Sequence, residues 1–170
     1  MSAPRRRTLL ARLRRAKRPV SGSELAAELG VSRQVVVQDV AILRAAGERV
    51  LATPHGYALE REPRGGAQAI LAVRHGRSQT ADELHALVDL GLEVVDVIVE
   101  HPVYGELRGL LHLRSREDVA RFIRRLDASG AGLLAAVTGG LHLHTVRGPR
   151  HDLIAKARVE LRRRGYLVER

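Results

Sequence analysis

The stretch SGSELAAELGVSRQVVVQDVAILRAAG, from Ser21 to Gly47, decides the fold of the first part of the chain. Ser21, with Glu24 three residues later, forms a capping box, which predicts a helix that stops at Gly30. Ser32 is a second N-cap, and the helix that it begins runs to Gly47. Because only the short link LGVS separates the two helices, the pattern predicts a helix-turn-helix.

The flanking segments complete a small domain. The segment RRRTLLARLRRAKRPV places Leu9, Leu13 and Ala16 on one face of a helix, and Pro19 ends it. After the helix-turn-helix, ERVLATPHGYAL is typical of two short strands around a Pro-His-Gly turn, the position of a wing. Residues 1–60 are therefore predicted to form a winged helix-turn-helix DNA-binding domain.

The outer face of the third predicted helix can read bases. Three successive valines cannot all face the core of a helix, so Val37 is expected on the outer face. Arginine pairs with guanine, glutamine with adenine, and a valine can touch a thymine methyl group. The expected DNA-binding residues are Ser32, Arg33, Gln34, Val37 and Gln38, with Arg12 and the wing-turn His55 on phosphates. A solvated polar face or a protein-binding module is the alternative.

Composition supports DNA binding. The formal net charge is +10, and the first 60 residues carry 11 basic against 5 acidic side chains, so the shorter segment is the more basic. Arginine greatly outnumbers lysine, which a GC-rich genome also explains. The absence of cysteine excludes disulfides and thiolate metal sites. No stretch approaches the roughly 20 apolar residues of a membrane span, and no signal peptide is visible, so a cytoplasmic location is expected.

A linker separates the second segment. EREPRGGAQ combines alternating charge with proline and glycine, which places the junction at residues 61–67 and a second domain at residues 68–170. Strands are predicted at 68–75, at 133–146 and, as a pair, within 93–113, and helices at 78–91, 115–130 and 150–165, with room for a short strand at 166–168. This order predicts an α+β chain whose second domain is an open-faced sandwich, an antiparallel sheet with helices on one face.

The stretch GGLHLHTV places His142 and His144 two residues apart on a predicted strand. Side chains at this spacing share one face of a strand. We expect Leu141 and Leu143 to face the core and both histidines to face outward. The pattern fits a metal site, and it also fits a strand whose outer face is merely hydrated.

Two further side chains can join this pair. His75 ends the first strand of the second domain, and Glu83 lies in the first turn of the next helix. Together with the two histidines they make a set of three nitrogens and one oxygen, which suits zinc, nickel, iron or manganese. The alternative is that Glu83 closes a capping box with Thr80, which explains it without a metal.

The segments VSRQVVVQDVAILRAAG, HGY, RH, ADEL, VEHPVYGEL and LHLHT together resemble the niacin-responsive repressors of NAD biosynthesis, which combine a winged helix with a three-histidine (3H) domain. The likeness covers nearly the whole chain. It implies a homodimer, a palindromic operator, nicotinic acid or a related small carboxylate as co-repressor, and one divalent transition metal ion per chain. The metal ligands that it implies are His75, Glu83, His142 and His144. His101 and Tyr104, in HPVYGEL, are the candidates for binding the effector.

These patterns predict a ligand-responsive DNA-binding repressor that is not an enzyme. A metal-sensing regulator without an organic effector is one alternative. A metal-dependent hydrolase fused to a DNA-binding domain is another, since a metal ion with an open position activates water. Asp82 is the one further carboxylate near the proposed ligands, and no pairing of base and nucleophile accompanies it.

Overall fold

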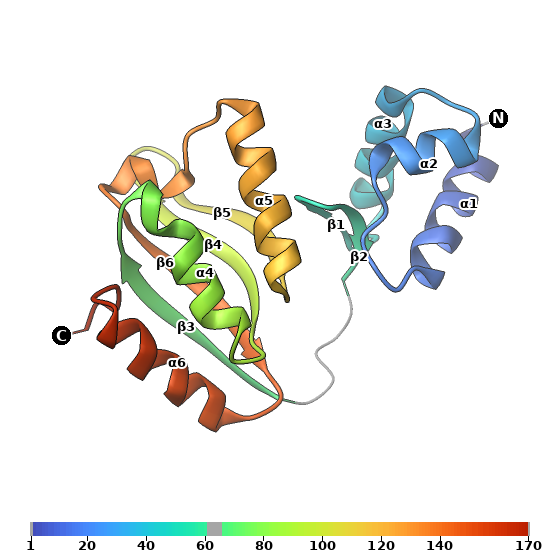
Figure 1. Cartoon of the computed structure of the whole chain (residues 1–170). Coiled ribbons are helices and arrows are strands. Elements are labelled where there is room, and N and C mark those ends of the chain that lie inside the picture. The colour runs from blue at the N-terminus through green and yellow to red at the C-terminus, as the bar shows by residue number, and fades with distance from the viewer. Residues whose placement is uncertain (1, 61–65, 170) are drawn as a thin grey trace. The chain divides into compact units, whose positions relative to one another are not determined.

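The chain divides into two compact units, Met1–Glu62 and Pro63–Arg170 (Figure 1). The computed structural model describes residues 2–60 and 66–169. Most of the predicted linker, residues 61–65, lies outside these ranges, and Ala67 already belongs to a strand. Among the described residues, no helix is both long and apolar enough to cross a membrane.

The first unit is a winged helix-turn-helix, as predicted. Its elements are α1 (Ser2–Arg15), α2 (Gly22–Leu29), α3 (Arg33–Ala45), β1 (Val50–Thr53) and β2 (Gly56–Leu59). The Ser21 hydroxyl accepts a hydrogen bond from the Glu24 amide, and the Ser32 hydroxyl accepts one from the Val35 amide. Both N-caps are confirmed. Glu24 does not complete its capping box, because its carboxylate pairs with arginines instead.

The core of this unit lies where the three helices meet the wing. Leu9 and Leu25 are fully buried, as is Val36 on the inner face of α3. The wing is fastened to the link between α1 and α2, where the backbones of Val20 and Tyr57 exchange two hydrogen bonds of 2.8 Å. The helix α3, which we call the recognition helix, and the wing therefore share one hydrophobic core.

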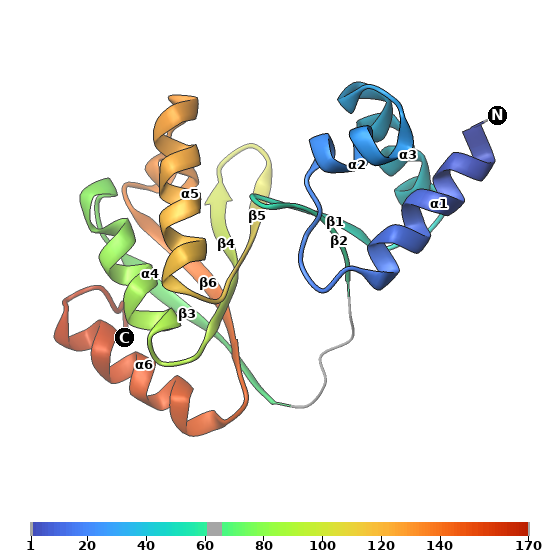
Figure 2. The ribbon, with the colours of Figure 1, turned by 45° about the vertical axis from the view of Figure 1, so that its right-hand side comes forward.

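The second unit is an antiparallel sheet covered on one face by helices (Figures 1 and 2). Its elements are β3 (Ala67–Arg74), η1 (Arg77–Gln79), α4 (Thr80–Val88), β4 (Glu93–His101), β5 (Gly105–Leu113), α5 (Arg116–Ser129), η2 (Leu134–Thr138), β6 (Leu141–Gly148) and α6 (His151–Arg163). The strand order is β3-β6-β4-β5. The predicted α+β class and open-faced sandwich are confirmed.

One core joins the sheet to its helices. Leu71 of β3 and Val146 of β6 pack against Leu84 and Leu87 of α4 and Leu161 of α6, and all five side chains are almost fully buried. This packing holds α4 and α6 beside the strands that carry the histidines. Burying these apolar side chains stabilises the unit.

One segment departs from the predicted elements, and another agrees with them. Residues 134–138 form the 3-10 helix η2 rather than a strand, because Gly139 and Gly140 follow with φ of 62° and 90°, which an extended chain does not allow. The predicted short strand at 166–168 does pair with β3. The amide of Arg74 donates to the carbonyl of Tyr166, and the amide of Val168 donates to the carbonyl of Ala72, both at 2.9 Å.

Candidate metal centre and nucleic-acid interface

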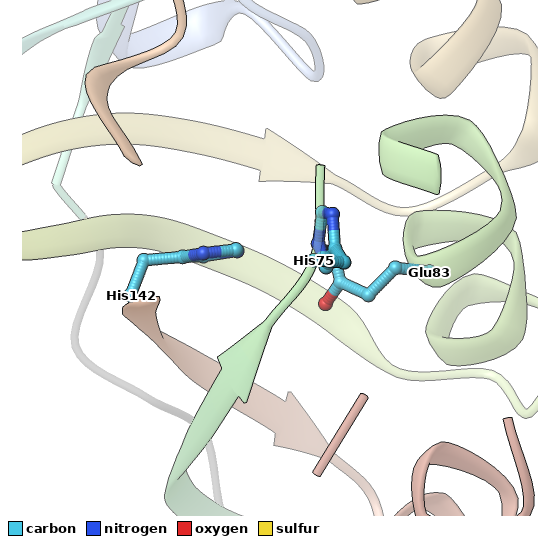
Figure 3. A group of neighbouring side chains, drawn as sticks. All are labelled: His75, Glu83 and His142. Carbon is cyan, nitrogen blue, oxygen red and sulfur yellow. The ribbon is translucent and has the colours of Figure 1, made fainter. Parts of the chain in front are cut away.

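The structure brings the four predicted metal ligands together. One ligand atom from each of His75, Glu83 and His142 lies within 4.8 Å of the others, and Figure 3 shows the three side chains converging. The fourth, His144, adjoins this group, since its Nε2 lies 3.4 Å from Oε2 of Glu83. The ligands come from the end of β3, from α4 and from β6.

The two histidines of β6 face the helices, not the solvent. His142 and His144 are 5% and 3% exposed, whereas Leu141 and Leu143 are half-buried on the other face. The predicted alternation is right but its direction is wrong. His144 lies directly across from the fully buried Leu71, because directly paired residues on neighbouring strands share a face.

Gly140 allows His75 to reach β6. The His75 amide donates to the Gly140 carbonyl over 3.4 Å, and a Cβ on Gly140 would lie 2.4 Å from the carbonyl oxygen of His75. Only glycine tolerates this contact together with its positive φ. The glycine pair that precedes His142-Leu143-His144 therefore lets the end of β3 approach β6 closely. This approach brings the three imidazoles next to one another.

All three imidazoles are held in the same way, each by a hydrogen bond from Nδ1 to a backbone carbonyl. Nδ1 of His75 donates to the Gly76 carbonyl at 2.9 Å, and Nδ1 of His142 donates to the Gly140 carbonyl at 2.9 Å. Nδ1 of His144 donates to the backbone carbonyl of Asp96 at 2.6 Å. Since a carbonyl only accepts, the proton of each neutral ring sits on Nδ1, and Nε2 keeps a free lone pair. Metal-binding histidines are held in this way by their second nitrogen.

Glu83 is a buried carboxylate without donors. Its side chain is 0% exposed, and neither oxygen accepts a hydrogen bond from the described residues. Nε2 of His75 is also buried without a partner, 3.4 Å from Oε2 of Glu83. Such groups are costly to bury unless something satisfies them. A divalent cation among these atoms would do so.

The electrostatics of the cluster are strongly coupled. Burial alone would raise the pKa of Glu83, but the neighbouring imidazoles in their protonated form, His144 first, outweigh it and lower the pKa. Burial lowers the pKa of His75 and of His144, yet the Glu83 carboxylate outweighs it and raises both. Burial and the charge of His144 lower the pKa of His142 to about 4. His142 is therefore neutral near pH 7 and able to bind a metal ion.

The capping-box interpretation of Glu83 is wrong. Thr80 is the first residue of α4, but its hydroxyl makes no hydrogen bond within the described residues. The 3-10 turn η1 runs directly into α4, so the residue before the helix, Gln79, has a helical backbone and no side-chain cap is present. Glu83 points into the cluster instead of back to the helix terminus.

Two residues that the sequence did not indicate, Tyr166 and Arg164, support the cluster. The ring of Tyr166 lies 5.3 Å from that of His75, and its hydroxyl donates to Asp82 at 2.8 Å. Arg164 also pairs with Asp82. The chain after α6 thus fastens the first turn of α4. No local pattern predicts this contact, since it joins positions more than 80 residues apart.

His101 and Tyr104 lie at the turn between β4 and β5. Nδ1 of His101 accepts hydrogen bonds from the amides of Val103 and Tyr104 at 3.1 and 3.2 Å, and the His101 and Tyr104 rings lie 4.9 Å apart. Tyr104 is 75% exposed. These contacts organise the turn itself and do not involve the four-residue cluster.

The recognition helix presents the expected face. Val36 and Val40 of α3 point into the core, whereas Arg33, Gln34 and Gln38 are exposed and Val37 is 39% exposed. His55 lies at the turn of the wing, between β1 and β2. The side chain of Ser32 caps α3. The N-terminus of this helix carries a partial positive charge, which favours binding of a phosphate.

Arg12 is not a free cation. Its guanidinium pairs with Glu28 at 2.8 Å and with Glu24 at 3.2 Å. Arg15 and Lys17, at the end of the same helix and just beyond it, are exposed and make no ion pair within the described residues. With Arg12 and Arg18 they line a hollow of about 420 Å³ at the end of α1. Because Arg15 and Lys17 have no carboxylate partner among the described residues, they are freer than Arg12 to pair with a phosphate.

Comparison with known proteins assigns a domain family to each of the two units. Residues 68–170, which carry the histidine cluster, match the 3H domain family, and residues 5–58 match an HTH domain. The chain belongs to the 3H-domain family. A "Probable transcription repressor NiaR" of Thermotoga maritima is 43% identical to it over 157 residues, which cover 92% of this chain and 89% of that protein.

A second relative is the "Transcription repressor NadR" of Bacillus subtilis, 38% identical over 172 residues, which cover 99% of this chain and 96% of the relative. Both relatives of this 3H-domain protein are named as transcription repressors and neither as an enzyme, as predicted. The HTH domain and the 3H domain that follows it cover residues 5–58 and 68–170.

Proposed function

We propose that this 3H-domain protein is a cytoplasmic transcription repressor of genes for NAD biosynthesis or niacin uptake, with nicotinic acid as its co-repressor. Two relatives named as repressors and an exposed, polar recognition face support DNA binding. The sequence likeness in HPVYGEL and HLHT to niacin-responsive repressors supports the effector. The four-residue cluster supports a site that binds an acidic effector.

We further propose that His75, Glu83, His142 and His144 hold one divalent transition metal ion per chain, either nickel, zinc, iron or manganese. The observation that carries this proposal is the fully buried Glu83, whose oxygens have no donor, beside Nε2 atoms with free lone pairs. Nitrogen and carboxylate donors suit these metals. A bound dication would supply a strong attraction for the carboxylate of a small effector.

A mobility-shift titration of a palindromic operator tests the function. Nicotinic acid is expected to tighten operator binding about 5- to 150-fold, the usual range of allosteric coupling, and nicotinamide, which lacks the charge, much less. The double variant His142→Ala, His144→Ala should lose this response and keep its basal affinity for DNA. A response to the metal ion alone would indicate a metal-sensing regulator, and hydrolysis of an ester panel would indicate an enzyme.

Base reading by α3 is tested with the same operator. Arg33→Ala should cost about 1–3 kcal/mol of binding free energy and relax the preference at one base pair. Arg44→Ala, at the opposite end of the same helix, is the matched control and should leave the base preference unchanged. Unaltered affinity of the double variant Arg33→Ala, Gln38→Ala would exclude this docking mode.

We propose a homodimer, since each chain carries one recognition helix and a single helix binds weakly. Two such helices would read half-sites of a palindrome in separate major grooves. Sedimentation equilibrium at micromolar concentration should give twice the 18.7 kDa mass of the chain. A monomer, both with and without nicotinic acid, would contradict the proposal.

A further inference from the structure

Thr80 carries a buried hydroxyl that no residue of the fold uses. It is the first residue of α4 and is 6% exposed, and its Oγ1 has no hydrogen-bond partner within the described residues. A threonine at the start of a helix normally bonds a nearby backbone group. Leaving the hydroxyl buried and unpaired makes the folded protein less stable than valine would at the same position.

Thr80 lies one helical turn before Glu83 of the four-residue cluster. Thr80 and Glu83 are three residues apart on α4, so their side chains are neighbours on one face of the helix. Among the described residues of the second unit, the buried side chains with unpaired polar atoms are those of His75, Thr80, Glu83 and His112. Three of these four belong to the end of β3 and the first turn of α4.

A metal ion would explain the unpaired atoms of His75 and Glu83, but it leaves the hydroxyl of Thr80 unexplained. Imidazole and carboxylate groups are ordinary ligands of transition metals, whereas a neutral threonine hydroxyl is not. What a hydroxyl does well is donate one hydrogen bond to an oxygen atom. An oxygen that is bound to the metal but does not come from the protein would meet this need.

We propose that Thr80 recognises the carboxylate of the effector by donating a hydrogen bond from Oγ1 to a carboxylate oxygen bound at the metal. This inference rests on the proposed function. It makes Thr80 a specificity-determining residue of the effector site, not a metal ligand. The unpaired hydroxyl is then a cost in stability that is recovered on binding.

Calorimetry on the full chain tests this in two steps, first with Ni²⁺ alone and then with nicotinic acid added to the nickel-loaded protein. Thr80→Val removes the hydroxyl and keeps the shape, and Thr80→Ser keeps the hydroxyl. We expect Thr80→Val to bind nickel within about 3-fold of the wild-type affinity and nicotinic acid about 10-fold or more weakly, the size of a lost hydrogen bond to a charged group. Thr80→Ser should bind both nearly as the wild type does.

The melting temperature of the metal-free protein provides a readout that a merely structural role would not produce. Thr80→Val should melt at the wild-type temperature or above it, since no bond is lost and an unpaired polar group is removed.

Three outcomes would overturn the inference: wild-type affinity of Thr80→Val for nicotinic acid, loss of nickel binding by Thr80→Val, or a lower melting temperature of that variant. Failure of the wild type to bind nickel or nicotinic acid would instead refute the proposed function, and the inference with it.

Discussion

At Glu83 the chain buries a carboxylate whose two oxygens accept no hydrogen bond from the described residues. Burial of an ionised group without partners is among the most unfavourable features that a folded protein can carry. The neighbouring imidazoles of His75 and His144 offset part of this cost. A cation coordinated by the same atoms would offset more, so this one residue links stability to metal binding.

Glu83→Gln is expected to abolish stoichiometric metal binding, because an amide oxygen is a far weaker ligand than a carboxylate. The metal-free variant should remain folded, since the substitution also removes a buried charge. Metal content by atomic emission and the circular dichroism spectrum measure the two effects. Glu117→Gln, an exposed carboxylate on α5, is the matched control. Full metal content in Glu83→Gln would exclude Glu83 as a ligand.

Two arginines of α1 should behave differently on DNA. Arg15→Ala removes a cation without an ion-pair partner among the described residues, and it should lower the slope of log affinity against log salt by about 1. Arg12→Ala breaks pairs with Glu24 and Glu28 and should change this slope much less. Fluorescence anisotropy with a random duplex at several salt concentrations gives both slopes. A larger change for Arg12→Ala would reverse this assignment.

Among the elements, β5 contains a bulge that an ion pair holds in place. Where β4 advances from Val94 to Asp96, β5 advances by one residue more, and His112 takes a left-handed backbone with φ of 51°. A residue other than glycine is strained there. Nδ1 of His112 lies 2.7 Å from the Glu93 carboxylate, which Arg114 also contacts. The ion pair compensates for the strained backbone.

Glu93→Gln should reduce the free energy of unfolding by about 1–2 kcal/mol at pH 7. Burial raises the pKa of Glu93, but the hydrogen bond to His112 and the charge of Arg114 outweigh it, so the pKa lies below its ordinary value. A lowered pKa stabilises the fold above the unfolded value of about 4.3, and the contribution disappears as the pH falls through the folded value. Urea unfolding at pH 7 and pH 3.5 should therefore show a smaller difference between variant and wild type in acid. An equal difference at both pH values would contradict this.

At the scale of the whole molecule, the two units have separate hydrophobic cores. The histidine cluster lies in the second unit alone. Metal binding should therefore stabilise the 3H domain and leave the winged helix unaffected. The reason is that the 3H domain buries charged ligand groups, which makes its metal-free state less stable.

Removal of the metal by a chelator should lower the unfolding temperature of the 3H domain while the winged helix keeps its own. Hydrogen exchange resolves the two units: amides of β3, β6 and α4 should lose protection, and those of α1 and α3 should not. The double variant His142→Ala, His144→Ala is the control and should show no response to the chelator. Equal loss of protection in both units would show that they unfold together.

Much of this protein could be predicted from its sequence, because short-range physics decides it. The N-caps at Ser21 and Ser32 and the apolar period of the helices are local features, so the winged helix and the order of elements in the 3H domain follow from them. The alternation of His142 and His144 is equally local, and it predicts that both side chains share a face. The set of four candidate ligands also came from spacing and likeness.

Only the tertiary structure decided what surrounds these residues. Alternation does not say which face of β6 the helices cover, and they cover the face that carries the histidines, not the leucines. The ion pairs of Arg12 and the contact of Tyr166 with His75 join segments that lie apart in the chain. The free hydroxyl of Thr80 depends on a turn that replaces a helix cap. The physical reason is that burial and pairing are set by long-range packing, which a local pattern does not encode.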